Sequence, residues 1–169
     1  MHIRRFTTAD AEIYQDLRLQ ALRDSPGAFS SSYEEECATP LTDVAVFIAP
    51  ESGRHVLGAF VDGRLVGMVG LGRDLRSKAS HKVFIRSMYV DPQYRGRKIA
   101  RRLLEEALAV ARSLGGVRQV TLAVTAGSTT ALALYQSLGF VAFGVEPRAL
   151  RVDGVFIDDV HMVRLIDAP

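Results

Sequence analysis

The sequence predicts an α/β (α+β) fold, a single domain over residues 1–169 built around one mixed sheet. A strand at His81–Val90, an amphipathic helix at Arg97–Leu114 and a strand at Val117–Val124 follow one another along the chain. Such a βαβ unit joins two parallel strands. Asp62-Gly63, between two apolar runs, is a strong signal for a two-residue hairpin, which joins antiparallel strands. A sheet that contains both kinds of pair is mixed, and 169 residues suffice for its core.

The remaining elements follow from apolar periodicity and from the residues that end each run. Ser25-Pro26-Gly27 ends a first helix, and Pro40 interrupts a second helical stretch. Gly67 and Gly70 lie inside a strand, where glycine indicates a bulge or a close neighbour. Beside the βαβ unit we expect, in chain order, a strand at Ile3–Phe6, a helix to about Arg23, helical turns within Ser30–Ala49, strands at Arg54–Val61 and Arg64–Gly72, a polar loop at Arg73–Ser80, a helix at Ser128–Leu138, and a hairpin of Val141–Val145 with Val155–Leu165 around Val152-Asp153-Gly154.

Composition argues against several classes of function. The net charge is only +2, so we expect no general attraction to nucleic acid. The longest apolar run, Val44–Ala49, is far too short to span a bilayer and we see no signal peptide, so we expect a cytoplasmic protein without a membrane partner. Cys37 is the single cysteine, which suits a reducing compartment. The histidines are scattered without metal-ligand spacing, so we expect no metal.

Positive residues crowd the start of the helix that follows Pro92. They are Arg95, Arg97, Lys98, Arg101 and Arg102. A helix start carries partial positive charge and unpaired amides, so acidic residues normally gather there instead. A strand, a short loop containing Gly96 and a basic helix start together indicate a phosphate-binding site. The alternative interpretation is a solvated basic face of the helix.

The segment Tyr94–Ala100 resembles the acetyl-CoA pyrophosphate loop of the GNAT superfamily of N-acetyltransferases, which reads Arg/Gln-x-x-Gly-x-Gly/Ala. The chain matches this loop at Arg95 and Ala100, and departs from it at Lys98, where the family usually has glycine. A lysine keeps the backbone amide but adds a side chain where the backbone approaches phosphate. If Lys98 has helical dihedral angles it fits without strain, and its ammonium group can contact phosphate.

A second segment, Ala131–Phe140, closely resembles the GNAT motif Asn-x-x-Ala-x-x-Leu-Tyr-x-x-x-Gly-Phe. Ser128 stands where the family usually has Asn, and serine can still cap the helix and donate one hydrogen bond to the cofactor. Two motifs on adjacent elements, in the right order, are far more specific than either alone. The resemblance covers the whole chain and implies a central, mixed, twisted sheet of six to seven strands, flanked by about four helices.

The resemblance also implies the chemistry, which is transfer of an acetyl group from acetyl-CoA to a primary amine by direct attack. The acceptor is a small-molecule or peptide amine. Tyr135 matches the family's general acid, because a phenol with an ordinary pKa of about 10 is protonated at neutral pH. A backbone amide around Tyr89 or Val90 would stabilise the developing oxyanion. The implied cofactor-binding residues are Met88, Tyr89, Val90, Arg95, Gly96, Arg97, Lys98, Ile99, Ala100 and Ser128.

The general base is not determined by the sequence. Relatives often hold a carboxylate on the strand before the pyrophosphate loop, whereas this chain has Arg86 and Ser87 in that neighbourhood. Candidates elsewhere are Glu34, Glu35, Glu36, His81, Asp158 and Asp159. A solvated helix face is the simpler explanation for at least two of the three consecutive glutamates. Arg86 could instead orient an acidic group of the acceptor.

Two other functions stay open at the level of the sequence. A non-catalytic CoA-binding or regulatory module is motivated by Lys98, Ser128 and the missing strand carboxylate. A nucleic-acid-binding domain that uses the basic helix start is the weaker reading. An exposed edge strand in the C-terminal hairpin could pair with a second copy, so a homodimer is also open.

Overall fold

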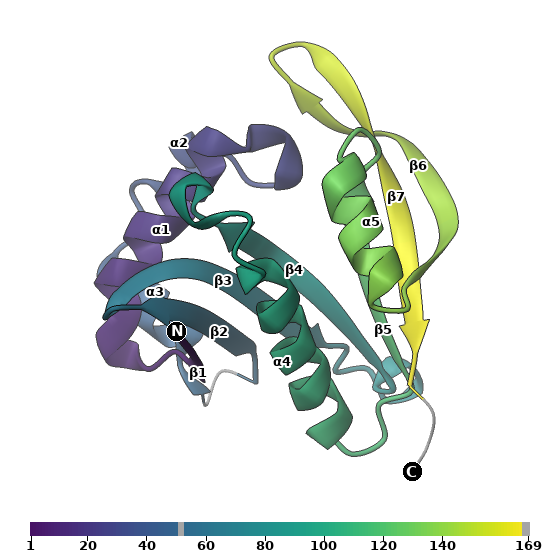
Figure 1. Cartoon of the computed structure of the whole chain (residues 1–169), viewed down its shortest axis with the longest axis horizontal. Helices are drawn as coiled ribbons and strands as arrows, with labels where there is room; N and C mark the ends of the chain where they lie inside the picture. Colours follow the sequence, from purple (N-terminus) through teal and green to yellow (C-terminus); the bar gives the residue numbers. More distant parts are fainter. Residues whose placement is uncertain (51–52, 167–169) are drawn as a thin grey trace.

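The computed structural model describes residues 1–50 and 53–166 and contains one seven-stranded mixed sheet (Figure 1). Its strand order is β1-β2-β3-β4-β5-β7-β6. The strands are β1 (His2–Arg5), β2 (His55–Val61), β3 (Arg64–Arg73), β4 (Lys82–Val90), β5 (Gln119–Thr125), β6 (Val141–Val152) and β7 (Val155–Leu165). β4 and β5 are parallel, as the βαβ pattern predicts, and the other neighbouring strands that the structure describes pair antiparallel.

Helices cover both faces of the sheet. They are α1 (Ala11–Asp24), α2 (Tyr33–Glu36), α3 (Leu41–Ile48), α4 (Ile99–Ser113) and α5 (Thr129–Ser137). Short 3-10 turns lie at Thr8–Asp10, Pro26–Ala28, Ser77–Ala79 and Pro92–Tyr94. α4 and α5 pack on one face, and α1 and α3 pack on the other (Figure 1). Among the described residues, no helix combines the length and the apolar character needed to cross a membrane.

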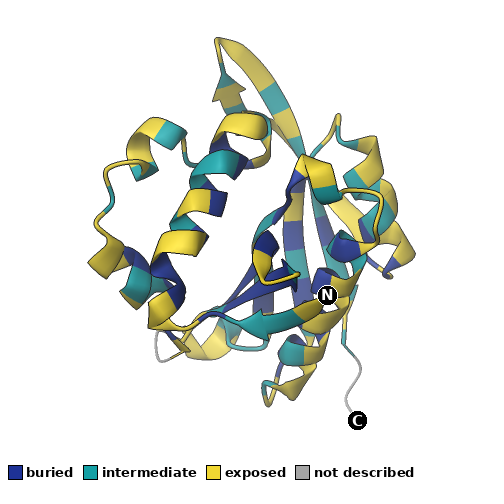
Figure 2. Cartoon of the chain, turned by 60° about the vertical axis from the view of Figure 1, so that its left-hand side comes forward, coloured by how far each residue is buried: buried dark blue, intermediate teal, exposed yellow. Residues whose placement is uncertain are grey.

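The apolar stripe of α4 is the centre of the larger core. Leu103, Leu104, Ala107 and Ala111 are fully buried, at the three- and four-residue spacing that places them on one face of a helix. They pack against β2, β3 and β4. Figure 2 shows the buried positions gathered on the strands and on the inner sides of the helices. This packing fixes the start of α4 relative to the end of β4.

β4 contains a bulge in the middle of its pairing with β3. Met68 pairs with Tyr89 and Gly70 pairs with Arg86, so one residue of β3 lies opposite two residues of β4. Ser87, one of those two, has a φ of 54°, in the left-handed region that non-glycine residues rarely adopt. Gly67 and Gly70 therefore mark both a bulge and a close approach, because a Cβ on Gly67 would lie 3.1 Å from the Tyr89 carbonyl oxygen.

Beyond this bulge β4 diverges from β5. The parallel ladder contains only three registered pairs and ends at Phe84–Thr121. A bulge bends its strand and increases the local twist, which carries the second half of β4 away from β5. Figure 1 shows the two strands together at one end of the sheet and apart at the other. From Ile85 onwards, the edge of β4 that faces β5 therefore pairs with no strand in the described part of the chain.

The C-terminal hairpin forms the far edge of the sheet. β6 is the edge strand, and its Val141, Phe143 and Val145 side chains are exposed. Its pairing with β7 slips between Glu146 and Leu150. The Asp158 side chain accepts a hydrogen bond of 2.7 Å from the Arg148 amide within this irregular stretch. The slip turns the end of the hairpin, which protrudes above the rest of the sheet in Figure 1.

The conformation of Lys98 corrects the expectation that it fits a helix without strain. Helix α4 begins at Ile99 rather than at Arg97, and Lys98 is its N-cap residue with φ 61° and ψ 15°. That is the left-handed conformation, which costs a residue with a Cβ roughly 1–2 kcal/mol. The usual glycine of the family would adopt it without this cost. The lysine amide is retained, but its backbone is strained.

We predict that Lys98→Gly stabilises the protein whereas Lys98→Ala does not. Both variants remove the ammonium group, but only glycine relieves the left-handed strain. The free energy of unfolding should rise by about 1 kcal/mol for Lys98→Gly relative to Lys98→Ala, which corresponds to an increase in Tm of roughly 2–4 °C. Thermal unfolding followed by circular dichroism measures the difference. Equal Tm values for the two variants would show that Lys98 is not strained.

Candidate active site

A cleft of about 1440 Å³ opens where β4 and β5 diverge. Residues of α1, the segment 25–31, β4, the loop after it, β5 and α5 line the cleft. The structure brings almost all the predicted site residues together here, with Arg97 as the exception. Those that line the cleft are Met88, Tyr89, Val90, Arg95, Gly96, Lys98, Ile99, Ala100, Ser128 and Tyr135.

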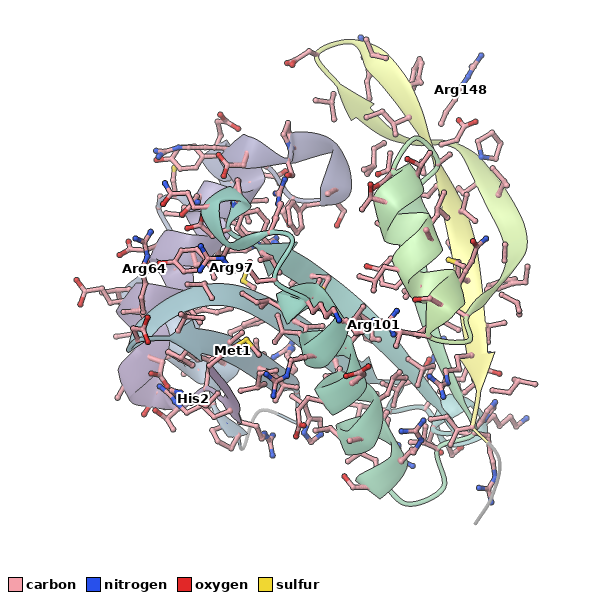
Figure 3. All side chains as sticks on the ribbon, in the orientation of Figure 1. Met1, His2, Arg64, Arg97, Arg101 and Arg148 are labelled. Carbon is pink, nitrogen blue, oxygen red and sulfur yellow. The ribbon has the colours of Figure 1, made fainter. Side chains whose placement is uncertain are left out.

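Arg97 lies outside the cleft. Its guanidinium carbon is 5.1 Å from the centre of the Tyr94 ring, and that of Arg64 lies 5.7 Å from the same ring. Figure 3 shows both arginines on the side of α4 away from α5, whereas Arg101 points towards α5. Arg101 donates a hydrogen bond of 2.6 Å to the Ser137 hydroxyl and so ties α4 to α5. The arginines of the basic cluster therefore make different contacts, and not all of them face the cleft.

The turn into α4 presents a run of free backbone amides. The first helical hydrogen bond runs from the Arg102 amide to the Lys98 carbonyl. The backbone amides of residues 96–101 donate no hydrogen bond to any acceptor in the described part of the chain. The Arg95 side chain turns back over β4 and donates from Nε to the Val90 carbonyl at 3.1 Å. Free amides at the positive end of a helix, beside cations, form a site for an anion.

The hydroxyl group of Tyr89 holds α1 against β4. Its hydroxyl donates a hydrogen bond of 2.6 Å to Asp24 and accepts one of 3.3 Å from Gln20. Burial and the nearby carboxylate raise the pKa of Tyr89 well above its ordinary value. The Asp91 amide donates to the Val66 carbonyl of β3, so by strand alternation the Val90 amide and carbonyl point to the unpaired edge.

Tyr135 lies on α5 at the inner wall of the cleft and is only 7% exposed. Its ring packs edge-on against Phe140, with 5.9 Å between the ring centres. Burial raises the pKa of Tyr135 to about 12, so its hydroxyl keeps its proton throughout the neutral range. No hydrogen bond joins that hydroxyl to another residue that the structure describes. It is a protonated donor without a protein acceptor.

Ser128 occupies the N-cap position of α5, but its hydroxyl does not cap the helix. The expectation of a capping hydrogen bond is therefore wrong. The Ser128 carbonyl accepts the first helical bond, from Leu132 at 2.9 Å, and the side chain is half-buried at the cleft wall. Its ψ of 71° departs from the extended backbone that a capping serine usually adopts. The hydroxyl is thereby available to the cleft.

Most of the acidic and histidine candidates lie away from the cleft. Glu35 accepts from the Ser32 amide in a capping box, Asp158 supports the β6 slip, and His81 precedes β4 at the closed end of the β4–β5 pair. Glu34 does not line the cleft either, so the view that two of the three glutamates are solvated is confirmed. Glu36 and Asp159 do line it.

Arg18 of α1 is a cleft residue that the sequence analysis missed. It is 8% exposed and forms a two-pronged ion pair with Glu36, with hydrogen bonds of 2.8 Å and 2.6 Å. Burial alone would raise the pKa of Glu36, but the Arg18 guanidinium holds it below its ordinary value. The sequence did carry a signal, because Arg18 interrupts the apolar stripe that Ala11, Tyr14 and Ala21 form on α1.

Arg86 lines the cleft. It lies on the strand on which the resembling proteins often have a carboxylate. Its guanidinium carbon stacks 4.2 Å from the centre of the Phe84 ring, and burial together with the charge of Arg54 lowers the pKa of Arg86. Among the described residues no carboxylate bonds to Arg86.

The apolar side chains of Phe29, Val44 and Phe47 form the wall of the cleft on the α1 side.

Comparison with known proteins agrees with this architecture. The model of the acetyltransferase (GNAT) family matches residues 12–140. The N-alpha-acetyltransferase RimI of Mycobacterium tuberculosis is 36% identical over 148 residues, which are 88% of this chain and 83% of that protein. A GNAT-family acetyltransferase from Streptococcus pneumoniae superposes with a TM-score of 0.89 at 25% identity, covering 98% of this chain and 99% of that one. The putative acetyltransferase yncA from Salmonella typhimurium, solved with acetyl-CoA, gives a TM-score of 0.86 at 20% identity and covers 100% of this chain and 95% of that one.

The fold places the two sequence motifs on the two sides of one cleft, at the point where a parallel pair of strands separates. The family model spans both motifs, and the RimI relative covers most of the chain. The chain therefore belongs to the GNAT family of acetyltransferases.

Proposed function

We propose that this protein transfers an acetyl group from acetyl-CoA to the α-amine at the N-terminus of a peptide or protein. The observation that carries the proposal is the arrangement of one cleft, which holds free amides at one end, an unpaired strand edge along its length and a protonated phenol at its inner wall. Each feature meets one requirement of thioester aminolysis. The α-amine acceptor is inferred from the relative named N-alpha-acetyltransferase RimI.

The amides of residues 96–101 and the nearby cations would bind the pyrophosphate of CoA. The residues fit this group, because the amides lack protein acceptors and a Cβ on Gly96 would meet nothing within 4 Å. Gly96, with a φ of 76°, gives the loop its left-handed turn. Arg95 is fixed by its bond to the Val90 carbonyl, and the Lys98 ammonium supplies a further charge. Arg97, stacked on Tyr94, contributes only long-range charge in this geometry.

The free edge of β4 would bind the pantetheine arm as an added strand. Pantetheine carries amide groups, and an unpaired strand edge offers the matching donors and acceptors. The Val90 amide points to this edge, whereas the backbone of Tyr89 faces β3. Of the two predicted oxyanion donors, Val90 therefore has the better geometry.

Tyr135 would protonate the departing CoA sulfur as the carbon–sulfur bond breaks. Its free hydroxyl and raised pKa keep it in the donor form, and its position on α5 places it on the α4–α5 face of the sheet. A buried phenol that cannot ionise near pH 7 is suited to a general acid and not to a base. The non-catalytic alternative differs from this proposal in one respect, because it assigns no proton transfer to the hydroxyl at the wall of the cleft.

A screen of acceptors by mass spectrometry tests the proposed function. The protein is incubated with acetyl-CoA and with peptides that have a free α-amine, peptides blocked at the N-terminus but containing lysine, and single amino acids. We expect release of the CoA thiol and one added acetyl group on peptides with a free α-amine. Transfer to lysine side chains alone would contradict the α-amine assignment, and thiol release from no acceptor would contradict the acetyltransferase itself.

We predict that Tyr135→Phe lowers kcat by about 10²-fold or more, because general-acid catalysis typically contributes that much. The dissociation constant for CoA, measured by calorimetry, should change by less than about twofold, since the ring and its packing on Phe140 are retained. Tyr33→Phe removes a phenol hydroxyl outside the cleft and serves as the control. A Tyr135→Phe enzyme with unchanged kcat would exclude Tyr135 as the general acid.

We also predict that Arg86→Ala raises the acceptor KM most for peptides with an acidic residue near the N-terminus. The Arg86 guanidinium is exposed at the cleft and bonds to no carboxylate of the described residues, so it can bind a carboxylate of the acceptor. The KM should rise about tenfold for acidic peptides, as expected for one charge-assisted hydrogen bond, and little for neutral ones. Lys82→Ala, on the same strand but outside the cleft, is the matched control. Equal changes in KM for acidic and neutral peptides would argue against this role.

A further inference from the structure

Three acidic side chains line the cleft, and two of them are occupied or solvated. Glu36 is bound on both oxygens by Arg18. Asp43 is exposed on the first turn of α3 and accepts a long hydrogen bond of 3.4 Å from Thr42. Asp159 differs, because its Oδ1 atom is buried and has no hydrogen-bond partner among the residues that the structure describes. Buried carboxylate oxygens are normally satisfied, so an unsatisfied one in a cleft calls for a functional explanation.

The register of the sheet places Asp159 on the face opposite Tyr135. Leu122 and Val124 of β5 are buried with α4 and α5, so the alternate residue Thr125 points to the other face. Thr125 indeed donates its hydroxyl to the Gly27 carbonyl, on the α1 side. Asp159 pairs directly with Thr125 across the β5–β7 ladder and therefore shares that face. Because the Thr125 hydroxyl donates its hydrogen bond to the Gly27 carbonyl, it does not donate one to the Asp159 carboxylate.

The surroundings of Asp159 favour a carboxylate that accepts a proton readily. Burial raises the pKa of Asp159 above its ordinary value; the nearby His161 lowers it and Glu146 raises it. Glu146 lies opposite Asp159 in the β6–β7 ladder and is 2.9 Å from the His161 Nε2 atom, so these two groups engage each other. In the described part of the chain, no group of three or more His, Cys, Asp or Glu side chains is placed to hold a metal ion.

We propose that Asp159 is the general base, which removes a proton from the attacking ammonium group of the acceptor. The inference rests on the proposed acetyltransferase function and adds a second catalytic residue to it. The acceptor approaches from the α1 side of the sheet, where Asp159 lies, and the CoA sulfur leaves towards Tyr135 on the α5 side.

The protons balance across these two groups. The ammonium gives its first proton to Asp159, which frees the nitrogen lone pair to form the bond with the thioester carbon. As the carbon–sulfur bond breaks, the sulfur takes a proton from Tyr135. The second proton lost by the nitrogen restores the Tyr135 hydroxyl, and Asp159 releases its proton to solvent. One acetyl transfer therefore yields one amide, one CoA thiol and one net proton.

The variant Asp159→Asn tests the assignment, with kcat/KM measured from pH 6 to pH 9.5 for a peptide with a free α-amine. At pH 7 we expect a loss of about 10²-fold, since a general base typically contributes that much. When the assay is extended to more acidic pH, the wild-type rate should fall as Asp159 becomes protonated, and the raised pKa moves this fall to a higher pH than for an ordinary aspartate. The variant should instead depend on amine that has already lost its proton in solution, so its rate should rise with pH and approach the wild-type rate at the alkaline end.

Stability separates catalysis from misfolding in this test. The pKa of Asp159 is higher in the folded than in the unfolded chain, so its ionised form destabilises the fold at any pH above both values. Asp159→Asn should therefore have a Tm equal to or above that of the wild type, and Asp159→Glu should recover part of the activity. Asp158→Asn, which removes the adjacent carboxylate outside the cleft but keeps an acceptor for the Arg148 amide, is the matched control and should be fully active.

Two results would overturn the assignment, and they have different meanings. An Asp159→Asn enzyme with the same pH profile and a rate within about twofold of an active wild type excludes Asp159 as the base, and leaves the acetyltransferase proposal intact. A wild-type enzyme that transfers no acetyl group to any amine removes the proposed function and this base with it.

Discussion

The separation of β4 from β5 is the constraint on which the rest of the structure depends. Two parallel strands would normally pair along their whole length, because each unpaired buried amide or carbonyl is costly. Here the pairing ends at Phe84–Thr121, and the bulge at Ser87 directs the rest of β4 away. The cleft exists because of this interruption. The unpaired edge that results is suited to a ligand that supplies its own amides.

Residues with unfavourable backbone conformations lie within that edge and at the start of the helix that follows it. Ser87 at the bulge and Lys98 at the start of α4 both have positive φ angles, and neither is glycine. Such strain persists where the surrounding packing fixes the backbone, and the fully buried Leu103 and Leu104 of α4 provide that packing. The stripe of α4 thus holds a strained loop in place. In the proposed complex, these two residues would lie where the backbone presents its amides to the cofactor.

In the proposed reaction, the two faces of the sheet divide the chemistry between them. Tyr135 reaches the cleft from the face covered by α4 and α5, and Asp159 from the face covered by α1. Burial shifts the pKa of both groups upwards, with opposite consequences. The phenol is thereby held as a donor, whereas the carboxylate becomes a stronger proton acceptor. In the proposed reaction, a proton donor and a proton acceptor on opposite sides of the reacting carbon would match attack from one side and departure from the other.

Local signals in the sequence predicted much of this structure. The hairpin at Asp62-Gly63, the βαβ unit and the helix that carries Tyr135 each depend on a few neighbouring residues and are confirmed by the structure. The left-handed Lys98 could not be predicted, because propensity favours a helix or an extended backbone for lysine and tertiary packing overrides it. The pairing of Asp159 with Thr125 depends on a register between strands far apart in the chain, which no local pattern encodes.

Hydrogen exchange measured by mass spectrometry, with and without CoA, tests the central claim most directly. If the unpaired β4 edge and the turn into α4 bind the cofactor, CoA should slow exchange at the Met88 and Val90 amides and at those of residues 96–101. Exchange in β1 and β2, which lie away from the cleft, should not change. Binding of CoA without protection of these two segments, or no binding at all, would contradict the account.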